Sequence, residues 1–186
     1  VKHFYGSGVG FRFFLDIGLY LENHRKSMNV ERLYALLEKG SLKTFFHVSL
    51  HLINAWFDLD PFPVIREKHP VDESVIEETT AFISRSGIHA SNPDFNVFES
   101  QSAAAALKNT SKKKFFISKL FPNYETMKGM YPYIGKLPLL LPVGWMQRGV
   151  SKLFTDRKNT LRKLKSANVD TKTRNSVTSL YKKLGL

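Results

Sequence analysis

The stretch Lys2–Leu21, KHFYGSGVGFRFFLDIGLYL, decides the fold that we expect for this chain. Its three glycines, at positions 6, 8 and 10, predict a tight turn, and the run that follows predicts a helix over residues 10–25. The apolar part of that helix carries only two charges, Arg12 and Asp16, which are four residues apart and share one face. Because the other residues are apolar nearly all round, we expect a buried helix that holds a buried Arg12–Asp16 ion pair.

The remainder of the chain predicts more helices and no strand. The expected helices span residues 30–39, 42–57, 72–85, 94–109, 111–121, 143–155, 157–167 and 170–184. We expect Asn29, Ser41 and Asp72 to cap three of these helices, and Asp60–Pro63 to form a break. No run of alternating polar and apolar residues is long enough for a strand. We therefore predict an all-α fold, an irregular multi-helix bundle with a basic helical C-terminal extension.

Charge divides the sequence into two parts. Residues 1–107 hold 10 Lys and Arg against 13 Asp and Glu, whereas residues 108–186 hold 18 against 3. We predict a near-neutral, slightly acidic helical core domain over residues 1–107, with the basic helical extension over residues 108–186 packed on it. The chain has no cysteine, which excludes a disulfide framework and is compatible with the cytoplasm, the location that we expect.

A basic cluster follows Trp145 in the sequence. Its candidate anion-binding residues are Lys152, Arg157 and Arg162. A solvated basic face is the first interpretation of this cluster. The second is a peripheral contact with an anionic membrane surface, because Trp145 and Leu139–Leu141 beside lysines are typical of an interfacial segment.

Nucleic acid ranks below the membrane as a partner. Lys112–Lys114 beside Phe115 and Phe116 fit a basic groove with aromatic platforms, which single strands bind. The two phenylalanines, however, continue an apolar pattern with Leu120, and that pattern favours a core.

His47 and His51 have the spacing of a zinc-binding helix, since they lie four residues apart on one face. Position 48, where a metalloprotease helix carries its glutamate, is a valine, and no third ligand is identifiable. We therefore expect two half-buried core histidines, and we name no metal ligand in this chain.

Two blocks of the sequence carry a family resemblance. The first is Lys2-His3-Phe4 with the glycine turn, Arg12 and Leu15-Asp16-Ile17; the second is Leu120-Phe121-Pro122, Met127-Lys128, Tyr131-Pro132, Leu137-Pro138, Leu141-Pro142 and Trp145. Together they are similar to the helical half of the uncharacterised bacterial nucleotidyltransferase family. That family is related to the polymerase-β-type nucleotidyltransferase superfamily and is often associated with surface-polysaccharide gene clusters.

The resemblance implies that this chain is the helical C-terminal part of a longer enzyme, with a catalytic sheet domain upstream. The complete protein would then transfer a nucleotidyl group with Mg²⁺ and a nucleoside triphosphate, and its partners would be that N-terminal domain and the nucleotide. The superfamily's Asp-x-Asp/Glu pair is missing here, because Gly18 lies two residues after Asp16 and Asp58-Leu59-Asp60 precedes a proline. We therefore expect no catalytic residue within these 186 residues.

The candidate substrate-binding residues lie near the N-terminus. The planar guanidinium of Arg12, oriented by Asp16, suits a nucleotide phosphate. Gly8 belongs to a turn whose backbone amides, before a helix, can bind an anion, and His3 could add a donor or a general base. The alternatives stay open: the ion pair could only tether the turn, the turn could be a plain connection, and His3 could pack locally.

Overall fold

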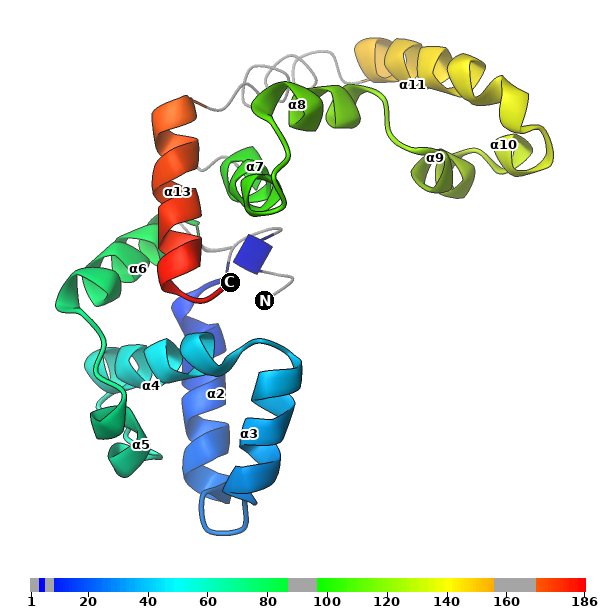
Figure 1. Ribbon diagram of the computed structural model, residues 1–186. Coiled ribbons are helices and arrows are strands. Elements are labelled where there is room, and N and C mark those ends of the chain that lie inside the picture. Colours follow the sequence, from blue (N-terminus) through cyan, green and yellow to red (C-terminus); the bar gives the residue numbers. More distant parts are fainter. Residues whose placement is uncertain (1–3, 6–8, 87–96, 156–169) are drawn as a thin grey trace. The chain divides into compact units, whose positions relative to one another are not determined.

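The computed structural model describes residues 4–5, 9–86, 97–155 and 170–186 (Figure 1). Every regular element in these ranges is a helix, so the all-α prediction is confirmed. The chain forms two compact units. Unit 1 comprises Val1–Ala104 and Thr171–Leu186, and unit 2 comprises Ala105–Asp170.

Helix α13 (Thr171–Lys183) belongs to unit 1, which differs from the expected division at residue 107. The hydroxyl of Tyr181 donates a hydrogen bond to the backbone oxygen of Phe4 (3.3 Å), and the two rings lie in contact. The α13 side chains that are buried in unit 1 are Arg174, Val177, Leu180 and Tyr181. Because α13 has an apolar face that only a core can cover, it joins unit 1 despite its many basic residues.

Unit 1 is built around α4. Its helices besides α13 are α2 (Phe11–His24), α3 (Val30–Lys39), α4 (Lys43–Phe57), α5 (Pro63–Lys68), α6 (Glu73–Ser86) and the first part of α7 (Val97–Leu107). The α4 side chains that are buried are Phe45, Phe46, Val48, Ser49, Leu50, Leu52 and Ile53. Helix α2 crosses α4 at Gly18, where an added Cβ would lie 2.7 Å from Cγ2 of Ile53, so only glycine permits this close approach.

Of the three predicted helix caps, Asn29 and Asp72 are confirmed and Ser41 is not. The side chain of Asn29 accepts a hydrogen bond from the backbone N–H of Arg32 (2.8 Å), as predicted for the start of α3. Ser41 is not the cap of α4, because its φ of 52° places it in a left-handed turn and α4 begins after Leu42. The predicted break at residues 60–63 ends in a short helix, α5, whose first residue is Pro63.

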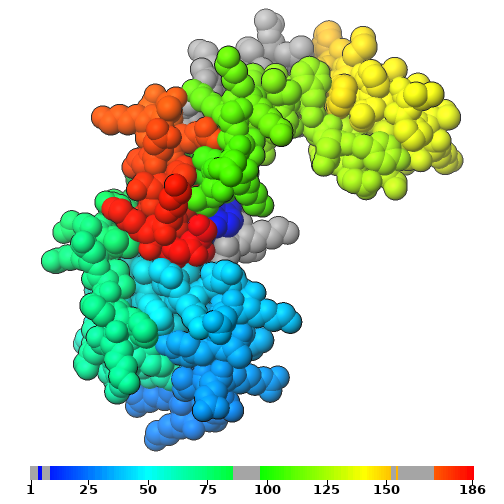
Figure 2. Space-filling view, in the orientation of Figure 1, coloured from blue at the N-terminus to red at the C-terminus, as the bar shows by residue number. Residues whose placement is uncertain are grey.

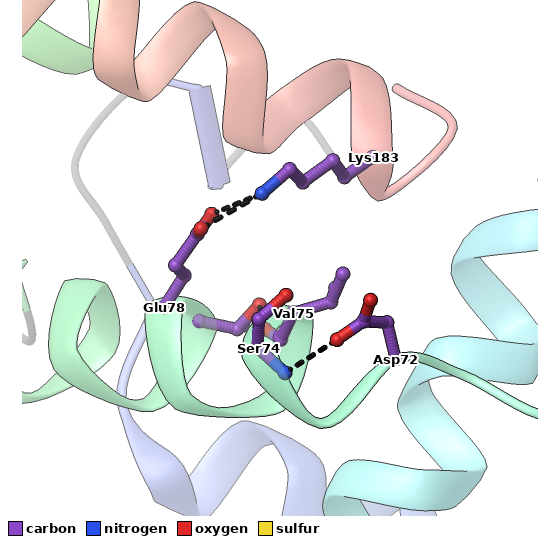
Figure 3. A network of polar contacts seen from close by, with 6 residues as sticks. Asp72, Ser74, Val75, Glu78 and Lys183 are labelled. Atoms are coloured by element: carbon purple, nitrogen blue, oxygen red, sulfur yellow. Dashed lines mark hydrogen bonds and ion pairs between the residues drawn. The ribbon is translucent and has the colours of Figure 1, made fainter.

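Helices α6 and α13 are joined by polar contacts at the edge of unit 1 (Figure 3). Asp72 accepts a hydrogen bond from the backbone N–H of Ser74 (2.8 Å), as expected for the start of α6. Hydrogen bonds from Ser74 lower the pKa of the Asp72 carboxyl. Lys183 donates to both carboxylate oxygens of Glu78, at 2.7 and 2.9 Å, and so ties the end of α13 to the middle of α6.

Unit 2 contains short helices where the sequence predicted only a proline-punctuated segment. Its helices are α8 (Lys112–Leu120), α9 (Tyr124–Met130), α10 (Pro132–Lys136), the 3₁₀ helix η1 (Pro138–Leu140) and α11 (Leu141–Thr155). Pro132 and Pro138 begin α10 and η1, because a proline at the first helical position loses no hydrogen bond. Helices α9 and α10 lie along one side of α11 (Figure 1), and Met127 and Ile134 form a buried core there.

Gly144 fixes which side of α11 faces that core. A Cβ at Gly144 would lie 2.5 Å from Cδ1 of Ile134 and 3.1 Å from Cε of Met127, whereas a Cβ at Gly149 would meet nothing within 4 Å. We expect Gly144→Ala to lower the free energy of unfolding by roughly 1–3 kcal/mol through overpacking. Gly149→Ala in the same helix should raise it by about 0.5–1 kcal/mol, since alanine is the better helix former.

Urea unfolding followed by circular dichroism measures both variants against the unchanged protein. Equal effects at the two glycines would contradict the packing of α11 on α9 and α10.

Candidate functional site

Arg12 and Asp16 share one face of α2, but they are exposed. Their side chains are 89% and 66% accessible, and Nε of Arg12 lies 3.8 Å from Oδ2 of Asp16. The expectation of a buried pair in a buried helix is therefore wrong. Helix α2 buries only the face that carries Phe14, Gly18 and Leu21, and its other apolar residues are partly exposed. An exposed pair of this kind contributes little to stability.

Beyond this pair, the structure describes the side chain of no other predicted site residue. His3, Gly8, Arg157 and Arg162 lie outside the described residues. Lys152 lies in the last part of α11, where only the backbone is described. Of the predicted set, the structure therefore brings together Arg12 and Asp16 alone among the residues that it describes.

His47 and His51 are half-buried, as predicted, and each already has a hydrogen-bond partner. Nε2 of His47 lies 2.9 Å from the hydroxyl of Tyr34 on α3, and Nε2 of His51 donates to the backbone oxygen of His69 (2.9 Å). The rings of His47 and His69 stack in parallel, with centroids 3.8 Å apart and planes 7° apart. Within the described ranges, no three His, Cys, Asp or Glu side chains could hold a metal ion.

No pattern in the sequence pointed to Tyr34 and His69 as members of this cluster. Tyr34 is 13 residues from its partner His47, and His69 lies after α5, in a segment without a recognisable motif. Only the folding of α3 and α5 onto α4 brings the three aromatic rings together.

Helix α11 carries an apolar stripe that nothing covers within the described residues. The stripe consists of Val143, Met146, Val150 and Phe154, which are 51%, 71%, 54% and 87% exposed. These residues recur at intervals of three or four and share one face of α11, which is a different face from that of Gly144. The atoms of α9, α10 and α11 form one continuous lobe in Figure 2. Just before α11, Leu139 is 92% exposed, so the apolar surface of this lobe does not end with the helix.

Trp145 takes no part in this exposed surface, contrary to its predicted interfacial role. Its indole N–H donates to the backbone oxygen of Pro122 (2.9 Å), and its ring contacts that of Phe121. Arg148, one turn further, points the same way, with Nη1 3.4 Å from the backbone oxygen of Leu120. Both side chains therefore attach α11 to the end of α8.

Unit 2 is strongly basic. Residues 105–170 hold 14 Lys and Arg against 3 Asp and Glu. Its described lysines with exposed side chains include Lys113, Lys114, Lys128 and Lys136. Phe115 is buried in α8, as the apolar pattern predicted, and Lys119 lies over its ring at 5.1 Å. Burial lowers the pKa of the Lys119 ammonium.

A hollow lies between α6 and α13 in unit 1. It has a volume of about 240 Å³, and its lining residues include Glu78, Phe82, Arg85 and Val177. Sites for drug-sized ligands usually measure about 300–1,000 Å³, and Glu78 is already bound to Lys183. The hollow is therefore not a candidate nucleotide site.

Comparison of the chain with models of known protein families, with curated proteins and with solved structures gave no match. The similarity to nucleotidyltransferases therefore stays a prediction from the sequence. Among the helices that the structure describes, none combines the length and the apolar composition that crossing a bilayer requires.

The exposure of Arg12 leads to a stability prediction. We expect Arg12→Ala to change the free energy of unfolding by no more than about 0.5 kcal/mol, because both partners of the pair remain solvated. Ile53→Ala, at a fully buried position that α2 crosses, serves as the contrast and should cost about 2–5 kcal/mol. A loss above about 2 kcal/mol for Arg12→Ala in chemical denaturation would restore the buried-pair interpretation.

Proposed function

We propose that unit 2 is a docking module that holds the protein at the surface of an anionic membrane. The observation that carries this proposal is the apolar stripe of α11 in a unit with 14 basic and 3 acidic residues. A helix with one apolar face lies in the plane of a bilayer interface with that face among the acyl chains. Basic residues nearby add attraction to anionic lipid headgroups.

The free energies are large enough for reversible binding. Full burial of a valine, methionine or phenylalanine side chain contributes about 1.5–3 kcal/mol, and the four stripe residues are each at least half exposed before binding. A lysine or arginine near an anionic surface adds about 1 kcal/mol. Neither the burial of the stripe nor the attraction of the basic residues has to be strong alone, because both act on the same unit.

Three of the four stripe residues are aliphatic, and this favours lipid over nucleic acid. Single strands bind rows of aromatic platforms that offer a free face, but Phe115 is buried, Trp145 is bonded to Pro122, and Phe154 is the one aromatic residue of the stripe. Valine and methionine side chains gain nothing comparable from a phosphate backbone. Docking on nucleic acid would leave the stripe exposed to water, whereas docking on a bilayer buries it.

Cosedimentation of the whole chain with lipid vesicles tests the proposal. We expect binding to vesicles of phosphatidylcholine mixed with phosphatidylglycerol, and much weaker binding to phosphatidylcholine alone. Phe154→Asp should weaken binding to the mixed vesicles by about tenfold or more, because it removes an apolar contact worth about 1.5–3 kcal/mol. Its side chain is 87% exposed, so the change should not harm folding.

Leu36→Asp is the matched control. Leu36 lies on α3 in unit 1, is 61% exposed and receives the same negative charge, yet its replacement should leave vesicle binding nearly unchanged. Equal losses from both variants would reduce the effect to net charge and contradict a role for the stripe. Retention on RNA or DNA without vesicle binding, or a dimer that Phe154→Asp dissociates, would assign unit 2 to a different partner.

Nucleotide binding near Arg12 is a second proposal, and the exposure of that guanidinium favours it. Arg12 lies in the first turn of α2, where helix backbone N–H groups and the guanidinium can meet the same phosphate. Mg²⁺ does not fit the described carboxylates, since Asp16 faces Arg12 and Asp60 binds Arg66. We therefore assign no catalytic step to these residues.

Equilibrium dialysis of the protein with a nucleoside triphosphate tests this second proposal. Arg12→Ala should weaken the binding, and Arg32→Ala, at an exposed position on α3, should not. Undetectable binding by the unchanged protein, or equal losses in both variants, would remove Arg12 from the site residues.

A further inference from the structure

We propose that His47, His69 and Tyr34 form a pH-sensitive clasp that holds α5 against the rest of unit 1 and opens when His47 is protonated. This inference is independent of membrane docking, because it concerns unit 1 alone. The clasp joins three segments: Tyr34 on α3, His47 on α4, and His69 directly after α5.

The geometry of the clasp depends on neutral rings. His47 and His69 stack at 3.8 Å with nearly parallel planes, and positive charge on both rings at this distance would be repulsive. Nε2 of His47 also lies 2.9 Å from the hydroxyl of Tyr34, which can donate a hydrogen bond to a neutral imidazole. Protonation of Nε2 would remove that acceptor.

The charged groups around His47 oppose its protonation as well. His69 faces it from the segment after α5, and His51 and Lys43 face it from α4; Lys43 is paired with Glu38 at 3.0 Å. Burial lowers the pKa of His47, and His69, His51 and Lys43 lower it further. Because the folded pKa lies below the ordinary value of 6.5, the clasp is fully stable above that pH and weakens as the pH falls.

Opening of the clasp would loosen α5, which is a short helix. It is six residues long, and Arg66 binds Asp60 just before it with distances of 3.0 and 2.8 Å. Under α5 lies a cluster formed by Leu21, Phe46, Leu50 and Phe62, against which Ile65 packs. Release of α5 would therefore uncover apolar surface of the core within unit 1.

Hydrogen exchange of the whole chain tests the clasp. Protection factors for residues 66–69, corrected for intrinsic exchange, should fall as the pH drops from about 7.5 to 5.5. Each extra proton bound by the open state changes the opening equilibrium by up to about tenfold per pH unit. Val177, Leu180 and Tyr181 of α13, which are buried in the core, should not follow this change.

His69→Phe keeps a stacked ring without a titrating group, and it also keeps the backbone oxygen that His51 binds. This variant should lose part of the pH response, because His47 keeps its burial and its bond with Tyr34 but no longer faces the charge of His69. His24→Phe is the matched control, because His24 also stacks on an aromatic ring, that of Tyr20, outside the clasp; it should respond like the unchanged protein. An undiminished response in His69→Phe would overturn the proposal.

A second test of the clasp needs no variant. Histidine titration by nuclear magnetic resonance on the unchanged protein should place the pKa of His47 below 6.5. A pKa for His47 at or above 6.5 would overturn the clasp even if His69→Phe did not fold.

Discussion

Unit 1 depends on the burial of α4, which needs cover on most of its sides. Seven of its fifteen residues are buried, so no single neighbour can satisfy it. Helix α2 approaches closely because Gly18 has no side chain, and α3, α5 and α6 cover other parts of its surface. Phe4 and Tyr181 bring the two ends of unit 1 against Phe45 and Phe82 of the same core. The packing of the other helices in unit 1 therefore follows from the need to enclose one apolar helix, α4.

Helix α11, in contrast to α4, keeps part of its apolar surface exposed. It also has fifteen residues, but its neighbours α9, α10 and η1 are too short to enclose it. They cover the face at Gly144 and leave the stripe exposed. An exposed apolar face costs free energy in water, so a protein that keeps one usually covers it in another state. The excess of basic residues in unit 2 is what makes an anionic surface the best-matched cover.

Local signals in the sequence were enough for most helix positions, and long-range packing explains what they missed. Asn29 and Asp72 could be recognised as caps because each binds a backbone amide two or three residues away. The exposure of Arg12 and Asp16 could not, because apolar residues on all sides of α2 hid which face α4 would cover. Trp145 was misjudged for a related reason: its partner, the backbone oxygen of Pro122, lies 23 residues away. No helix was predicted in residues 122–142, which contain several prolines, although a proline at a first helical position favours a helix.

The proposed membrane docking of unit 2 and the proposed clasp of unit 1 respond differently to pH. The charge of unit 2 comes from lysines and arginines, which stay protonated between pH 5 and 8, so acidification alone changes it little. The clasp depends on His47, whose pKa is lowered by burial from its ordinary value of 6.5, and so it responds to acidification. An anionic surface potential of about −30 mV raises the local proton concentration, which corresponds to roughly half a pH unit. This effect extends only about 10 Å from the lipid, so a bilayer would influence the clasp directly only if His47 came within that distance.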